Sequence, residues 1–156
     1  MNISAGQPAP DFSLVAHDKQ KVTLSELKGQ PVVLLFFPLA FTSVCTAELC
    51  SVRDNLSWYE GLHARVFGIS VDSVYTLAKF REEQSLNFPL LSDFNKEVST
   101  AYGSIYPTFA FGMQGVSKRS AFVVDKDGIV QYAEVLENAG EVPDFEKIKA
   151  ALEGLA

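Results

Sequence analysis

The chain has 156 residues, of which 47% are hydrophobic and 21% are charged, and this composition predicts one globular domain spanning residues 1–156. Its net charge of −6 argues against nucleic acid or an anionic membrane as a partner. The chain starts without a signal-peptide pattern, and its longest apolar run, near residues 31–41, is too short to span a bilayer, so we expect a cytoplasmic protein with no membrane partner.

Alternating polar and apolar residues predict an edge hairpin near the N-terminus, formed by residues 11–15 and 21–24. The run 32–37 is apolar on both faces, as in a central strand of a covered sheet. Thr42 or Ser43 can cap a helix over residues 44–60. The elements predicted after it are strand 65–71, helix 73–84 capped by Asp72 or Ser73, strand 88–91, helix 95–102, loop 104–117, strands 120–124 and 129–136, and helix 144–153.

This order of strands and helices predicts an α/β fold. The tight turn at residues 125–128 joins the last two strands as an antiparallel hairpin, which disfavours a purely parallel, doubly wound sheet. The order fits a thioredoxin-like fold with an N-terminal β-hairpin extension and a central mixed sheet flanked by helices.

Cys45 falls in the first turn of the helix predicted over residues 44–60. Unpaired backbone N–H groups and the positive end of the helix dipole meet there, and both stabilise a thiolate over a thiol. Thr42 can turn its hydroxyl toward the sulfur or a bound substrate, and the ring of Pro38 can cover the sulfur with an apolar surface. The pattern predicts an anionic nucleophile in a small, partly dry pocket.

The segment from Pro38 to Cys45 matches the peroxiredoxin motif of a proline, three residues, a threonine, two residues and a cysteine. The likeness extends over nearly the whole chain, and the chain therefore resembles the peroxiredoxins. Residues 37–42 and 128–135 look most like the alkyl hydroperoxide reductase E group, whereas the spacing of Cys45 and Cys50 is similar to that of the bacterioferritin comigratory protein group.

The resemblance implies that the Cys45 thiolate attacks a hydroperoxide and becomes a sulfenic acid. It also implies three donors that stabilise the charge on the peroxide oxygens: the Thr42 hydroxyl, the backbone N–H of Cys45 and the guanidinium of Arg119, which precedes the strand at 120–124. Glu48 lies three residues beyond Cys45, where it could either orient Arg119 or favour the first turns of the helix electrostatically.

Cys50 is the second of only two cysteines. Five residues of helix separate their Cα atoms by roughly 8–9 Å, whereas a disulfide tolerates at most about 7 Å. If the two bond, the first turns of the helix must unwind. By resemblance, Cys50 resolves the sulfenic acid of Cys45 as a disulfide; alternatively, Cys50 is a buried small residue and an external thiol reduces Cys45 directly.

The partners that the resemblance implies are a hydroperoxide substrate, a thioredoxin or glutaredoxin-like reductant and a second copy of the chain in a homodimer. The sequence predicts neither a cofactor nor a metal, because His17 and His63 share no ligand spacing with the cysteines. A non-catalytic, thioredoxin-like redox-sensing module is the alternative from another functional class.

Overall fold

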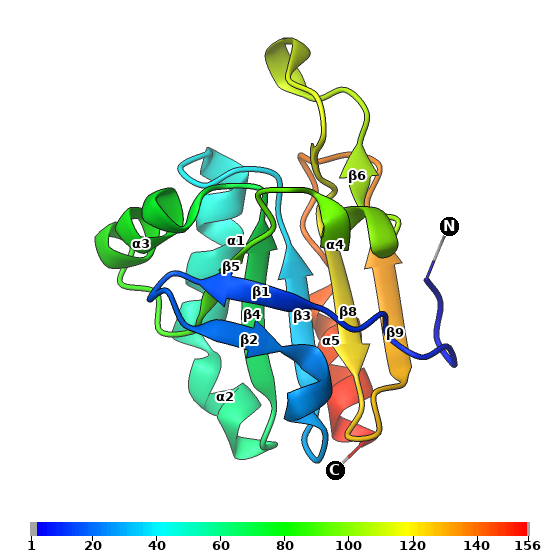
Figure 1. The fold of residues 1–156 in the computed structure, drawn as a ribbon. Coiled ribbons are helices and arrows are strands. Elements are labelled where there is room, and N and C mark those ends of the chain that lie inside the picture. The colour runs from blue at the N-terminus through cyan, green and yellow to red at the C-terminus, as the bar shows by residue number, and fades with distance from the viewer. Residues whose placement is uncertain (1–2, 156) are drawn as a thin grey trace.

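A computed structural model of the chain describes residues 3–155 (Figure 1). Its strands are β1 (Ser13–Ala16), β2 (Lys21–Thr23), β3 (Val32–Phe36), β4 (Arg65–Ser70), β5 (Leu90–Ser92), β6 (Ile105–Tyr106), β7 (Val116–Ser117), β8 (Ser120–Val124) and β9 (Val130–Val135). Its α-helices are α1 (Ser43–Asp54), α2 (Leu56–Gly61), α3 (Val74–Glu83), α4 (Glu97–Ala101) and α5 (Phe145–Glu153). Short 3-10 helices cover Leu24–Leu27 and Ala110–Gly112.

The central sheet has seven strands in the order β2-β1-β5-β4-β3-β8-β9. Strands β3, β4 and β5 are parallel to one another, whereas β8 pairs antiparallel with both β3 and β9 and adds a hairpin at one edge. The β1–β2 hairpin is paired at the other edge through β5. The predicted mixed sheet with an N-terminal hairpin extension is confirmed.

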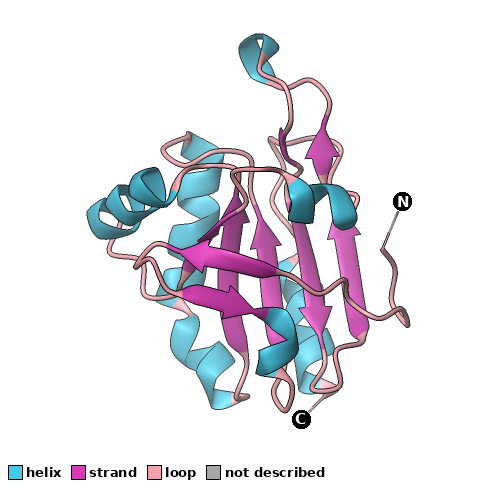
Figure 2. Ribbon diagram, in the orientation of Figure 1, coloured by secondary structure: helices cyan, strands magenta, loops and turns pink. Residues whose placement is uncertain are grey.

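Both faces of the sheet are covered, so β3 and β8 are completely buried. On one face α1, α2, α3 and α5 pack on residues such as Leu35 and Val123. On the other face the N-terminal hairpin region and α4 cover Leu34 and Phe122 (Figure 2). The continuous apolar run of β3 is therefore explained by burial on both sides, as the sequence predicted.

The helix predicted over residues 44–60 is in fact two helices, and this prediction is corrected. The break is at Asn55, whose backbone leaves the helical region with φ −116° and ψ 12°. The Asn55 amide donates to the carbonyl of Ser51 at 2.9 Å. Such side chains compete for backbone partners and so disfavour a helix interior.

Residues 104–117, predicted as loop, contain the antiparallel pair β6–β7. Two-residue strands are too short to give an alternating pattern, which explains why the sequence did not reveal them. In Figure 1 the segment between them projects beyond the end of the sheet. The other predicted elements lie within a few residues of the observed ones.

Within residues 3–155, no helix combines the length and the apolar character that crossing a bilayer requires.

Candidate active site

The turn between β3 and α1 places Cys45 in the first turn of a helix, as predicted. In this turn Phe41 has a φ of 68°, a left-handed conformation that is uncommon for residues other than glycine. The Asp72 carboxylate accepts a hydrogen bond from the backbone N–H of Ala40 at 2.8 Å and another from the Ser70 hydroxyl at 2.6 Å. Asp72, which follows β4, thus holds the turn that precedes Cys45.

Thr42 is the N-cap residue of α1, but its side chain does not cap the helix. Its hydroxyl donates instead to the carbonyl of Leu39 at 2.8 Å. The predicted capping bond is therefore wrong, because the hydroxyl of Thr42 is directed at the Leu39 carbonyl instead. The first N–H groups of α1 are left free of a Thr42 cap and can face an anion.

Arg119 comes into direct contact with Cys45, although 74 residues separate them in sequence. Because β8 is antiparallel to β3, with Ser120 opposite Phe36, the start of β8 lies beside the end of β3. The Arg119 Nη2 lies 3.2 Å from the Cys45 Sγ, and Nη1 lies 2.7 Å from the Glu48 Oε1. Nε donates to the carbonyl of Ala139 at 2.9 Å, so three sides of the guanidinium are fixed.

All three residues of this cluster are buried: as whole residues, Cys45 is 0% exposed, and Glu48 and Arg119 are 2% exposed. Burial raises the pKa of Glu48 to about 7, although the neighbouring Arg119 charge acts in the opposite direction. Burial alone lowers the pKa of Arg119, but the negative charges of Cys45 and Glu48 outweigh it and the pKa is raised. Arg119 therefore stays a cation that faces two acids.

The structure brings Cys45, Glu48 and Arg119 into direct contact. Pro38 is buried at the start of the turn, while Cys50 is half-buried further along α1. The Cys50 Sγ lies 3.6 Å from the Gln84 Oε1, on a different face of the helix from Arg119. Both cysteines are free.

Two groups that shape the site have no sequence signal. Asp72 was predicted only as an alternative cap for α3, whereas Ser73 is the cap and accepts from the Thr76 N–H. The carbonyl that orients Arg119 belongs to Ala139, in the connection between β9 and α5. A backbone carbonyl leaves no trace in residue type, so only the three-dimensional turn could reveal it.

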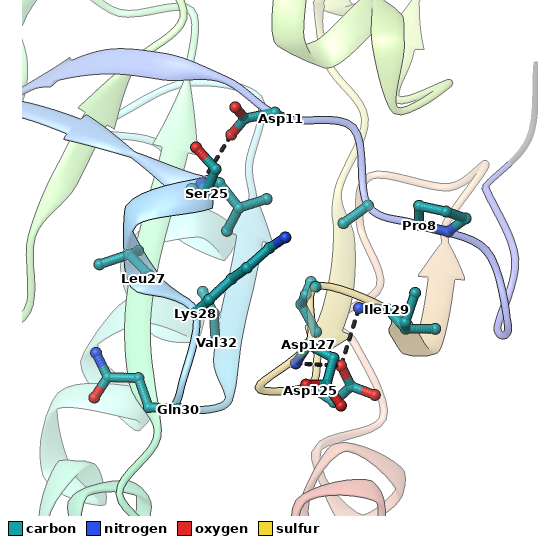
Figure 3. Close-up of a pocket in the computed structure, with 14 residues that line it drawn as sticks. Pro8, Asp11, Ser25, Leu27, Lys28, Gln30, Val32, Asp125, Asp127 and Ile129 are labelled. Carbon is teal, nitrogen blue, oxygen red and sulfur yellow. Dashed lines mark hydrogen bonds between the residues drawn. The ribbon is translucent and has the colours of Figure 1, made fainter.

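A separate cavity of about 310 Å³ lies at the other end of the strands. It is lined by Val32, at the start of β3, and by Asp11 and Asp125, and the Lys28 side chain extends into it (Figure 3). None of the predicted site residues lines it. The chemistry at Cys45 is therefore separate from this cavity.

This chain is similar to known proteins in both sequence and fold. The sequence profile described as the AhpC/TSA family matches residues 5–133. Alkyl hydroperoxide reductase E of Mycobacterium tuberculosis is 40% identical over 146 residues, which cover 91% of each chain. The crystal structure of peroxidoxin BcpB from Mycobacterium tuberculosis has a TM-score of 0.87 at 32% identity and covers 99% of each chain. Xanthomonas campestris bacterioferritin comigratory protein has a TM-score of 0.83 at 27% identity, covering 96% of this chain and 98% of that one.

The sheet order and these structural likenesses define a thioredoxin-like fold of the peroxiredoxin type. The chain belongs to the AhpC/TSA family. The resemblance to peroxiredoxins predicted from the sequence is confirmed, and the protein is an oxidoreductase of the peroxidase class. The non-catalytic redox module is thereby set aside.

Proposed function

We propose that Cys45 is the nucleophile of a thiol-dependent peroxidase that reduces hydrogen peroxide and organic hydroperoxides. The thiolate attacks the terminal peroxide oxygen, so an S–O bond forms as the O–O bond breaks. The sulfur becomes a sulfenic acid, and the leaving oxygen departs with the electron pair as water or alcohol after taking a proton. The observation that carries this proposal is the contact of 3.2 Å between the buried Arg119 guanidinium and the Cys45 sulfur.

Arg119 and the backbone N–H of Cys45 supply positive charge where the peroxide oxygens become negative. We infer a different role for Thr42 from the predicted one, in which its hydroxyl donates a hydrogen bond to the peroxide. Its only hydroxyl hydrogen is directed at Leu39, so the oxygen is free to accept a hydrogen bond from the peroxide O–H and to orient it. Glu48 orients Arg119 through the bond of 2.7 Å, and Pro38 shields the sulfur from water.

Stopped-flow mixing of reduced protein with hydrogen peroxide tests the proposal, with the fluorescence of the single tryptophan, Trp58, as the signal. We expect a second-order rate constant far above that of free cysteine. Cys45→Ser should abolish the reaction. A Cys45 that reacts no faster than free cysteine contradicts the proposed nucleophile.

For the second half of the cycle we infer that Cys50 attacks the sulfenic sulfur of Cys45, which forms a disulfide and releases water. A thioredoxin or glutaredoxin-like dithiol then reduces this disulfide. Both cysteines lie in the intact helix α1, so its first turns must unwind before the sulfurs can meet. The alternative, direct reduction of Cys45 by an external thiol, needs no unwinding.

Intact-mass measurement after one equivalent of peroxide, with thiol trapping, separates the two routes. A product that has lost two hydrogens and cannot be alkylated supports an intramolecular disulfide. A sulfenic acid on Cys45 together with an alkylated Cys50 supports the one-cysteine route. Turnover with thioredoxin and its reductase then identifies the reductant class.

We also propose a homodimer in the cytoplasm. Support for the dimer comes from large apolar side chains that remain in solvent: Phe111 is 100% exposed at the projecting β6–β7 segment, and Phe41 is 49% exposed in the turn that precedes Cys45. Exposed apolar surface of this kind favours association. Sedimentation velocity should show a dimer that Phe111→Ser weakens; an unchanged monomer argues against it.

A further inference from the structure

Glu48 is an unusual partner for Arg119 because it has no contact with solvent. Its side chain is 0% exposed, and one of its oxygens, Oε1, accepts from Arg119. The other oxygen, Oε2, is the one buried side-chain polar atom within residues 3–155 that lacks a hydrogen-bond partner. An ionised carboxylate with an unpartnered buried oxygen is costly, whereas a neutral carboxylic acid costs much less.

The cluster contains one cation and two acids that can ionise. When Cys45 is a thiol and Glu48 a carboxylate, the charges of Cys45, Glu48 and Arg119 sum to zero. They also sum to zero when Cys45 is a thiolate and Glu48 a carboxylic acid. With both acids ionised, the buried cluster carries a net negative charge, which a low-dielectric site disfavours strongly.

Within residues 3–155, the titratable groups next to Arg119 give this cluster no second positive charge. Lys118, the neighbour of Arg119, is directed to Glu137 at 2.6 Å. Tyr106 donates its hydroxyl proton to the carbonyl of Leu136, and burial raises its pKa, so it stays neutral. The third hydrogen bond of the Arg119 guanidinium goes to the uncharged carbonyl of Ala139.

We propose that Glu48 takes up a proton when Cys45 ionises and gives it up when the peroxide is reduced, so that the two acids share the single charge of Arg119. This inference rests on the proposed peroxidase chemistry at Cys45. Glu48 acts on the sulfur through Arg119, so it is a positioning residue whose protonation follows the state of the sulfur. Burial raises the pKa of Glu48 to about 7, so its protonated form is accessible at neutral pH.

The proton balance closes over the first half-reaction. Ionisation moves one proton from the Cys45 thiol to the Glu48 carboxylate. The thiolate then takes the terminal OH group of the peroxide and becomes a sulfenic acid, while the O–O bond breaks and its electron pair leaves on the other oxygen. That alkoxide or hydroxide gains one proton as Glu48 returns to a carboxylate, so thiol and hydroperoxide give sulfenic acid and alcohol or water.

The substitution Glu48→Gln tests this coupling, because glutamine keeps an acceptor for the Arg119 Nη1 but cannot ionise. The rate at which iodoacetamide alkylates Cys45 follows thiolate formation and needs no leaving oxygen. We expect the pH of half-maximal alkylation to fall by about one unit or more, since Arg119 no longer serves a competing anion. Glu60→Gln, an exposed site on α2, removes the same charge and should leave the profile unchanged.

Glu48→Ala separates coupling from simple orientation of Arg119. A residue that only orients Arg119 predicts slower peroxide reduction in Glu48→Ala at every pH and an unchanged alkylation profile in Glu48→Gln, and that result overturns the inference. If the inference fails in this way but the unmodified protein reduces peroxide fast, the proposed peroxidase function still stands. Slow reduction by the unmodified protein contradicts the proposed function itself.

A second measurement uses the unmodified protein, so it does not depend on how the variant folds. Infrared difference spectra at pH 7 should lose the C=O band of a protonated carboxylic acid when one equivalent of peroxide oxidises Cys45. The band should be absent before and after oxidation in Glu48→Gln. A difference spectrum without this band overturns the inference.

Discussion

Arg119 shows how a single side chain assembles the site. Its planar fork reaches the Cys45 sulfur and the Glu48 carboxylate at once, while Nε is held by the Ala139 carbonyl. A lysine carries the same charge as a point and cannot make these contacts together. The geometry therefore depends on arginine rather than on positive charge alone.

Arg119→Lys should lower the second-order rate constant for peroxide by about 10²- to 10³-fold, the loss typical when one donor to a developing charge is removed. Stopped-flow kinetics measure the effect. Arg65→Lys is the matched control, since Arg65 is exposed and pairs with Val32 at the start of β3, whereas Cys45 follows the end of β3. A rate for Arg119→Lys equal to that of the control argues against the fork geometry.

His17 gives a prediction on stability. Burial, with a further contribution from Arg81, lowers the pKa of His17 below 6.5. The unfolded chain then binds more protons than the folded one between the lowered pKa and 6.5, so the free energy of unfolding falls as the pH drops through that window. In His17→Asn this fall in the free energy of unfolding should be smaller. The difference should be less than about 1 kcal/mol, because the ring is partly solvated.

Urea unfolding at pH 7.5 and pH 5.5 measures this change. His63→Asn, at an exposed position, is the control and should keep the fall of the unmodified protein. Equal pH dependence in His17→Asn and the unmodified protein means that His17 contributes nothing to it.

The sequence predicted the candidate residues better than their contacts. Cys45 and Thr42 stand in a local motif that resembles that of the peroxiredoxins, and the same resemblance selects Arg119 from its place before a strand. The hydroxyl of Thr42 turns to Leu39 because of the fold of the turn, which no local pattern encodes. The role of Glu48 stayed open because helical spacing tells which side of the helix Glu48 lies on, but not whether the side chain is buried.

Near Cys50, helix α1 is held against the C-terminal end of α3. The Arg53 Nη1 donates to the carbonyl of Gln84 at 2.6 Å, and the Asn87 amide donates to the carbonyl of Arg53 at 3.2 Å. The Cys50 sulfur contacts the Gln84 side chain. Unwinding of α1 around Cys50 therefore has to break contacts that Arg53 and its neighbours make.

Arg53→Ala should speed formation of the Cys45–Cys50 disulfide by about fivefold, because a hydrogen bond that opposes unwinding contributes on the order of 1 kcal/mol. Rapid quenching with acid, followed by intact mass, measures the rate after oxidation by peroxide. Arg81→Ala removes a similar bond, from Nε to the Phe88 carbonyl at 3.0 Å, outside α1 and serves as the control. An unchanged rate in Arg53→Ala shows that this contact does not limit unwinding.

The element order was predictable because buried strands and amphipathic helices have different periods. The break at Asn55 and the pair β6–β7 were not, since each depends on one or two residues whose conformation is set by their surroundings. Their position matters nevertheless, because β6 brings Tyr106 close to Arg119.

Over the whole molecule, the site depends on the close packing of the sheet against its helices. Gly68 in β4 lies at a point where the core leaves no room for a side chain. A Cβ at this position would lie 2.7 Å from the Leu90 Cδ2 and 3.3 Å from the Phe37 Cε1. Phe37 directly precedes Pro38, so a shift at Gly68 reaches the turn that carries the active site.

Gly68→Ala should therefore lower the free energy of unfolding by about 1–3 kcal/mol, the usual cost of an extra methyl group in a filled core. It should also slow peroxide reduction, because Phe37 has to move and displaces the turn before Cys45. Gly61→Ala is the control, since nothing lies within 4 Å of a Cβ there and the change should be neutral or slightly stabilising. Urea unfolding and stopped-flow kinetics on both variants measure the two effects. If Gly68→Ala loses stability but keeps the full peroxide rate, the core absorbs the methyl group through Leu90 alone, and the turn is independent of the packing beneath it.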